Sequence, residues 1–168
     1  LAAAVTAVTY TETAVLGEMS FRILPSPAGD SARTLVSPDL AVCADCRREI
    51  RSEGDRRQGY VFTNCTNCGP RYSIIRGVPY DRPLTSMAVF RMCPACQREY
   101  DDPADRRFHA QPNACAACGP SCRLRADGED LPGDPLAAAR RIIAEGGIVA
   151  VKGIGGYHLA CDARSEEA

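Results

Sequence analysis

Eight of the ten cysteines form four Cys-x-x-Cys pairs, whose chemistry is the easiest in the chain to interpret. They make two sets, each with 18 residues between its two pairs: Cys43, Cys46, Cys65 and Cys68, and Cys93, Cys96, Cys115 and Cys118. Zn²⁺ favours four thiolates in a tetrahedron, and the turn within each pair brings two sulfurs to one ion. The spacing therefore predicts two closed, structural zinc sites, with one ion bound within each set.

Two alternatives to zinc coordination by these cysteines stay open at this point. A disulfide framework suits a secreted protein, but a Cys-x-x-Cys disulfide is typical of redox motifs, and residues 1–8 lack the basic flank of a secretion signal. Iron is the alternative metal for thiolate ligands. Cys122 and Cys161 have no Cys-x-x-Cys partner, so we expect neither to be a ligand.

Residues 38–124 form a repeat with a period of 50 residues, in which the two cysteine sets align without a gap. The triplet Asp55-Arg56-Arg57 aligns with Asp105-Arg106-Arg107, which indicates a duplication. Each unit is too short to bury an apolar core, so we expect bound metal to stabilise it and the two units to fold largely independently.

The repeated Asp-Arg-Arg triplet has two interpretations. It is either a local, salt-bridged turn or a pair of exposed arginines that contact the phosphates of RNA or of a phosphorylated substrate. His109 has no counterpart in the first repeat, where the equivalent residue is Gly59. We expect it to be a structural residue that packs on the metal-binding loop.

The segments outside the repeat have the patterns of other domains. Residues 5–11 and 19–24 are rich in β-branched and aromatic residues, which predicts strands, and residues 25–37 have the composition of a linker. Because Leu1 is not an initiator methionine, we expect the chain to be an internal piece of a longer protein.

The carboxyl-terminal segment has the pattern of an opening α/β domain. Asp134 is expected to cap a helix that ends at Gly146 and Gly147. The apolar runs 148–151 and 157–161 then predict two strands on either side of a glycine-rich turn.

Lys152 lies at the end of the first of these strands and is the only lysine among the twenty lysine and arginine residues of the chain. A strand end beside a glycine-rich turn lets backbone amides approach an anion, and an ammonium differs from a guanidinium in size and hydration. We therefore predict that Lys152 binds an anionic ligand, with chance use of a single lysine as the alternative.

Charge and hydropathy exclude some classes of protein. The net charge is -1, and no apolar run reaches the roughly 20 residues that span a bilayer. A nucleic-acid binder that depends on bulk charge is disfavoured, no membrane partner is expected, and we expect a cytoplasmic location.

Several longer motifs resemble those of one known family. Residues 64–74 (NCTNCGPRYSI), 79–83 (PYDRP) and 105–112 (DRRFHAQP) resemble the zinc-finger region of the HypF family. Residues 148–163 (IVAVKGIGGYHLACDA) are similar to the start of the YrdC-like domain that follows it. The position of residues 1–24 corresponds to the end of an acylphosphatase-like domain.

The resemblance implies an α+β, multi-domain fragment. Its expected parts are the C-terminal end of an acylphosphatase-like α/β domain (1–30), two small C4 zinc modules in tandem (38–75 and 88–125) and the beginning of a YrdC-like α/β domain (134–168). The resemblance also implies an activity: carbamoyl phosphate and ATP, with Mg²⁺, carbamoylate the C-terminal cysteine of HypE for cyanide ligand synthesis in [NiFe] hydrogenase maturation. Lys152 would then contact the nucleotide or carbamoyl phosphate. We expect the catalytic residues to lie in other domains and this segment alone to be inactive.

The alternative function is a zinc-dependent RNA-binding or protein-interaction module that presents arginines to its partner: Arg56, Arg57, Arg106 and Arg107. YrdC-like domains are associated with double-stranded RNA, so nucleic acid stays an alternative partner. A chaperone-type zinc domain is disfavoured, because the cysteine pairs lack the CxxCxGxG pattern of that class.

Overall fold

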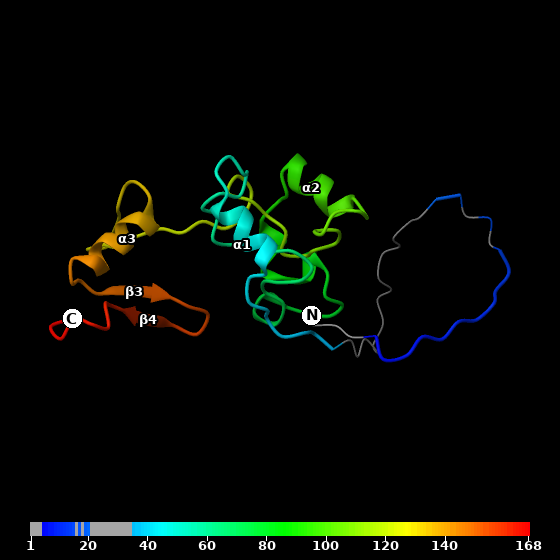
Figure 1. Cartoon of the computed structure of the whole chain (residues 1–168), viewed down its shortest axis with the longest axis horizontal. Coiled ribbons are helices and arrows are strands. Elements are labelled where there is room, and N and C mark those ends of the chain that lie inside the picture. The colour runs from blue at the N-terminus through cyan, green and yellow to red at the C-terminus, as the bar shows by residue number, and fades with distance from the viewer. Residues whose placement is uncertain (1–4, 16, 18, 21–34) are drawn as a thin grey trace. The chain divides into compact units, whose positions relative to one another are not determined.

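The computed structural model describes residues 5–15, 17, 19–20 and 35–168 (Figure 1). The chain divides into two compact units, Leu1–Gly119 and Pro120–Ala168. None of the helices in the described part of the chain has both the length and the apolar character of a membrane span.

Residues 5–15 contain no helix or strand, so the strand predicted at 5–11 is wrong for this structure. The apolar side chains there, such as Val5 and Tyr10, are 84% and 90% exposed. A strand is stable only where a neighbour pairs with its backbone and covers its side chains, and neither occurs here. Most of the second predicted strand and of the linker lies outside the described residues, and the assignment of residues 1–30 to an acylphosphatase-like domain stays a prediction.

Two short helices, α1 (Ala44–Arg51) and α2 (Pro94–Asp101), begin directly after the first cysteine of each set. Cys43 caps α1, and its Sγ accepts a hydrogen bond from the backbone N–H of Cys46 at 3.5 Å. Pro94 is the first residue of α2, a position whose N–H makes no hydrogen bond within the helix, so proline is tolerated there. The first Cys-x-x-Cys pair of each set therefore lies at the start of a helix, whose first turn brings its two thiols to the same side.

After each helix the chain makes the same turn back towards the metal-binding loop. The backbone N–H of Gly59 donates to the Ile50 carbonyl at 2.8 Å, and that of His109 donates to the Tyr100 carbonyl at 3.0 Å. Both residues have a positive φ, +71° for Gly59 and +50° for His109. His109 holds this strained conformation while its ring lies 4.6 Å from that of Tyr100, centroid to centroid. These contacts agree with the structural role expected of His109.

The connection between the two helices contains three short 3₁₀ helices: η1 (Tyr72–Ile74), η2 (Arg82–Leu84) and η3 (Ser86–Val89). Arg82 is buried and fastens this connection to the second module. Its guanidinium donates to the carbonyls of Asn113 at 2.9 Å and Phe90 at 2.7 Å.

The interior of the first unit is made mainly of cysteines and hydrogen-bonded polar side chains. Arg57 is 2% exposed and Arg107 3% exposed. Arg57 belongs to the first module but forms an ion pair with Glu99 of the second at 2.5 Å. Arg107 belongs to the second module and forms an ion pair with Glu49 of the first. The structure does not fit the expectation of independent modules, because each supplies part of the other's interior.

The second unit begins with a hairpin of β1 (Arg125–Ala126) and β2 (Glu129–Asp130), joined by Asp127 and Gly128. It continues with α3 (Pro135–Ala144), β3 (Val149–Lys152) and β4 (Tyr157–Ala160), the two strands pairing antiparallel. The Asp134 side chain accepts from the backbone N–H of Leu136 at 2.9 Å, and Gly146 has a φ of +84°. The predicted helix, its cap and both strands are confirmed.

We predict that Arg57→Ala destabilises the metal-loaded first unit by about 2 to 3 kcal/mol, because it leaves Glu99 half-buried without its main cationic partner. Denaturant unfolding followed by circular dichroism measures this loss. Arg51→Ala, at an exposed position of α1, is the matched control and should change stability by less than about 0.5 kcal/mol. Equal stability of the two variants would contradict the interlocked packing.

Candidate metal centres

The structure brings together the four thiols of each predicted set. In each set the sulfur atoms all lie within 4.8 Å of one another. Cys43 and Cys65 have their sulfurs 3.8 Å apart, as do Cys65 and Cys68. In the second set, the sulfur of Cys118 is 3.7 Å from that of Cys115 and 3.6 Å from that of Cys96.

These distances fit a tetrahedral metal ion. A Zn–S bond of about 2.3 Å places the ligand sulfurs of a tetrahedron about 3.8 Å apart, whereas a disulfide requires about 2.05 Å. All ten cysteines are free thiols. The geometry therefore disfavours the disulfide framework and supports two four-thiolate centres.

The second pair of each set is followed by a glycine that the packing requires. Gly69 has a φ of +96°, and a Cβ added there would lie 2.5 Å from the Cβ of Asn64. At Gly119 the requirement is space, because an added Cβ would lie 2.1 Å from the Tyr60 hydroxyl. Both turns must therefore stay free of a side chain, as a tight metal-binding knuckle demands.

The thiols of each set differ in acidity. The backbone N–H of Cys96 lowers the pKa of Cys93 to about 7. Burial raises the pKa of the Cys43 thiol, but hydrogen bonds from the Cys46 backbone and the neighbouring thiols outweigh it and lower the pKa to about 7. Burial raises the pKa of Cys46 and Cys96. Because metal ligands must be thiolates, these buried thiols need a nearby cation.

Arginines from the opposite module supply positive charge at these buried thiols. Arg56 donates from Nη2 to the Cys96 sulfur at 2.8 Å, and Arg106 donates from Nη1 to the Cys46 sulfur at 3.0 Å. Both arginines also pair with the glutamate three residues after the cysteine, Glu99 and Glu49 respectively.

Both interpretations of the Asp-Arg-Arg triplet need correction. Asp105 does form a local turn, since its carboxylate accepts from the backbone N–H of Arg107 at 2.7 Å. The guanidinium groups, however, bind the other module. Arg57 and Arg107 are buried, so they are not exposed for RNA, and the alternative function loses two of its four arginines.

Sequence reasoning missed Glu49 and Glu99 as partners of these arginines. Burial alone raises the pKa of Glu99, but its hydrogen bonds with Arg57 outweigh burial and hold the pKa below its usual range. The signal was present, because both glutamates are kept at equivalent positions of the repeat, together with both Asp-Arg-Arg triplets.

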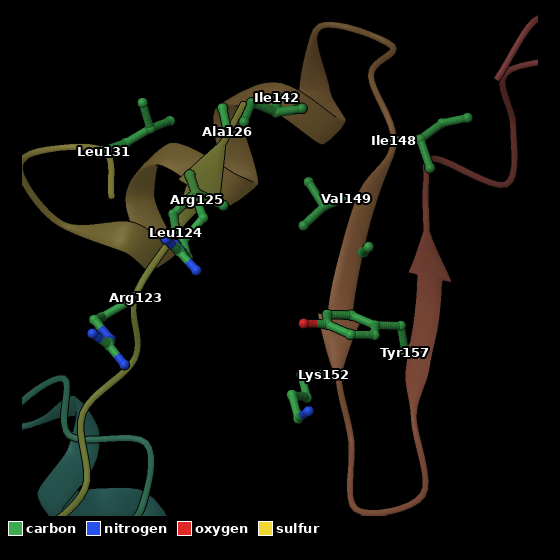
Figure 2. A pocket seen from close by; sticks show the side chains of 11 residues that line it. Arg123, Leu124, Arg125, Ala126, Leu131, Ile142, Ile148, Val149, Lys152 and Tyr157 are labelled. Carbon is green, nitrogen blue, oxygen red and sulfur yellow. The ribbon is translucent and has the colours of Figure 1, made fainter. Parts of the chain in front are cut away.

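Lys152 belongs to the second unit, where it is the last residue of β3. Its Nζ is 5.3 Å from the centroid of the Tyr157 ring, which is a cation–π contact. Both residues line a cavity of about 630 Å³ in this unit (Figure 2). Apolar residues such as Ile142 and Val149 line one part of it and cations line another: Arg123, Arg125 and Lys152.

Comparisons with known proteins assign these features to a family. Residues 42–75 and 92–125 match the family described as HypF finger, and residues 141–168 match the family described as Telomere recombination, whose model is named Sua5_yciO_yrdC. Carbamoyltransferase HypF of Rhodobacter capsulatus is 56% identical over 148 residues, which cover 88% of this chain and 20% of that protein. The chain belongs to the HypF family.

Other HypF proteins agree. Carbamoyltransferase HypF2 of Cupriavidus necator is 55% identical over 153 residues, or 88% of this chain and 19% of the relative. Full-length HypF in its phosphate- and nucleotide-bound form matches with a TM-score of 0.72 at 52% identity, over 82% of this chain and 18% of that one. The structure of T. kodakarensis HypF matches with a TM-score of 0.75 at 52% identity, over 79% of this chain and 18% of that one.

The chain thus spans about a fifth of the length of the curated HypF relatives it matches. The predicted resemblance is confirmed, as are two tandem four-cysteine modules followed by the start of a YrdC-like domain. The exact domain boundaries stay predictions.

We predict that Cys65→Ser exposes both modules of this HypF segment to protease, rather than the first alone. The lost ligand releases the loop that carries Arg57, and the second module then loses the partner of Glu99. Limited proteolysis with mass mapping locates the cuts. Cys122→Ser, which changes a cysteine outside both sets, is the control and should leave both modules protected; cuts confined to residues 38–75 in Cys65→Ser would contradict coupling.

Proposed function

We propose that each cysteine set binds one Zn²⁺ ion and that both ions are structural. The observation that supports this is the closed geometry, in which four protein sulfurs at tetrahedral spacing leave no position for a substrate or water. Borderline-soft Zn²⁺ suits four thiolates, and its binding free energy of about 10 to 16 kcal/mol can replace the apolar core that the modules lack. Iron is the alternative occupant, which elemental analysis distinguishes.

We expect two zinc ions per chain by elemental analysis of protein purified under reducing conditions. Cys65→Ser and Cys115→Ser should each lower the zinc content, whereas Cys161→Ser, which changes an exposed cysteine outside both sets, should keep two ions. Fewer than two ions in the parent, or iron in place of zinc, would overturn this assignment.

For the whole protein that contains this segment, we propose an ATP-dependent carbamoyltransferase. The observation that carries the proposal is the name carbamoyltransferase HypF on relatives 56% and 51% identical to this chain. Carbamoyl phosphate is hydrolysed to carbamate and phosphate. Carbamate then displaces pyrophosphate from ATP·Mg²⁺ to give carbamoyl adenylate, and the C-terminal thiolate of HypE displaces AMP to give a thiocarbamate.

This segment contributes two things to the proposed activity. The paired metal centres hold the two modules of the first unit together as one interlocked element. The YrdC-like start contributes Lys152, whose ammonium lies at the cationic part of a cavity and contacts phosphate or carbamate oxygens. Among the described residues, no carboxylate forms a salt bridge with Lys152, so its charge is available to an anion.

In the full-length protein, Lys152→Arg should lower carbamoyl-phosphate-dependent ATP turnover at least ~10-fold, because a guanidinium keeps the charge but misplaces it against a tightly held anion. Turnover is measured as pyrophosphate release. Zinc content should stay at the parental value, and Arg140→Lys, at an exposed position of α3, is the control for the exchange of these cations.

Two outcomes separate the claims. A full-length parent without carbamoyl-phosphate-dependent turnover would refute the carbamoyltransferase. A parent with this activity and a Lys152→Arg variant that matches it would refute only the role of Lys152.

A further inference from the structure

In each module one guanidinium joins the two cysteine pairs of the other module. Arg57 donates from Nε to the carbonyl of Ala114 at 3.2 Å, directly before Cys115, and from Nη1 to Glu99 at 2.9 Å, on the helix that carries Cys96. Arg57 therefore holds together the two halves of the second cysteine set.

The same arrangement holds in the opposite direction. Arg107 donates from Nε to the carbonyl of Asn64 at 2.9 Å, directly before Cys65, and from Nη1 to Glu49 at 3.3 Å, on the helix that carries Cys46. Because Asn64 and Ala114 are equivalent in the 50-residue repeat, the two contacts are the same contact made twice.

We propose that these two arginines, Arg57 and Arg107, make metal binding at the two cysteine sets cooperative. Each is a positioning residue for the metal site of the opposite module. The inference rests on the proposal that both sets bind zinc, and it adds that neither set reaches full affinity while the other is empty.

Loop closure explains how one ion affects the other site. Residues 47–64 lie between the Cys46 and Cys65 ligands of the first set, so an ion in that set closes an 18-residue loop and fixes Arg57 within it. Fixing this loop removes chain entropy that would otherwise be lost when Arg57 binds the second module. The second set then meets its ion with both cysteine pairs already in place.

Hydrogen bonds to sulfur also favour cooperative binding of the two ions. Four thiolates around a divalent ion leave excess negative charge, and the guanidinium groups of Arg56 and Arg106 lie at that charge, each on a sulfur of the opposite set. A metal-bound sulfur also has a fixed position, so it is a better-placed acceptor than a rotating thiol. An ion in one set thereby holds the arginine of the other module, and the effect is reciprocal, as linkage requires.

Backbone contacts join the modules beside the ligands. The Thr66 backbone N–H and side chain both donate to the Arg106 carbonyl, at 3.1 and 3.0 Å. The Asn64 side chain donates to the carbonyl of Pro112 at 3.0 Å. These hydrogen bonds connect the segment around the second cysteine pair of the first module to the loop of the second module.

The test is a Zn²⁺ titration of the metal-free, reduced chain, with loaded species counted by native mass spectrometry. Independent, equal sites give about half of the molecules one ion at half saturation, whereas a coupling of about 100-fold gives roughly a tenth. We expect the parent to show the smaller value. In the double variant Arg57→Lys/Arg107→Lys, which keeps charge but loses the Nε contacts, the singly loaded fraction should rise towards half.

The matched control is Arg48→Lys/Arg98→Lys, at equivalent exposed positions of α1 and α2, which should titrate like the parent. Should the Arg57/Arg107 variant fail to fold in excess zinc, the partly exposed pair Arg56→Lys/Arg106→Lys replaces it, with a smaller rise expected. A parent that binds fewer than two ions overturns the zinc proposal. A parent that binds two ions with half of the molecules singly loaded at half saturation overturns cooperativity alone, and a variant that matches the parent overturns the role of these arginines.

Discussion

The first unit depends on the contacts that Arg57 and Arg107 each make with the opposite module. A buried guanidinium is unfavourable without partners, and here each has a carboxylate, a backbone carbonyl and a nearby sulfur, all supplied by the other module. Two modules that are each too short for an apolar core thereby share one polar interior. The first unit is stabilised by its clustered thiols and by the ion pairs between its modules, with little contribution from apolar burial.

This arrangement links the metal chemistry to the packing. Cys43 and Cys93 cap the two helices, whose first turns orient the thiols of the first cysteine pairs. The same helices carry Glu49 and Glu99, which form the ion pairs with the arginines of the opposite module. We therefore expect the loss of one centre to disturb the other through groups that are not ligands.

The sequence predicts the local features well and the contacts between modules poorly. Cysteine spacing and the cap at Asp134 act over a few residues, so the two sets, α3 and the strands β3 and β4 follow from pattern alone. The repeat pattern, by contrast, is compatible both with side-chain contacts inside each module and with contacts between the two modules. Only the packing of the folded chain selects between these arrangements. The positive φ of His109 could have been predicted, because the repeat aligns this residue with Gly59. The β-branched and aromatic residues at 5–11 predicted a strand wrongly, because composition does not supply a neighbouring strand.

Amide hydrogen exchange of the zinc-loaded chain tests most directly whether the two modules are one cooperative unit. Suitable probes are the first helical amides, that of Arg47 bonded to the Cys43 carbonyl and that of Gln97 bonded to the Cys93 carbonyl, each at 2.9 Å. A single unit opens with one free energy, so the two amides should agree within about 0.5 kcal/mol and lose protection together in Arg57→Ala, although Arg57 directly contacts only the second centre. Protection lost at Gln97 while that at Arg47 stays at the parental value would contradict the account.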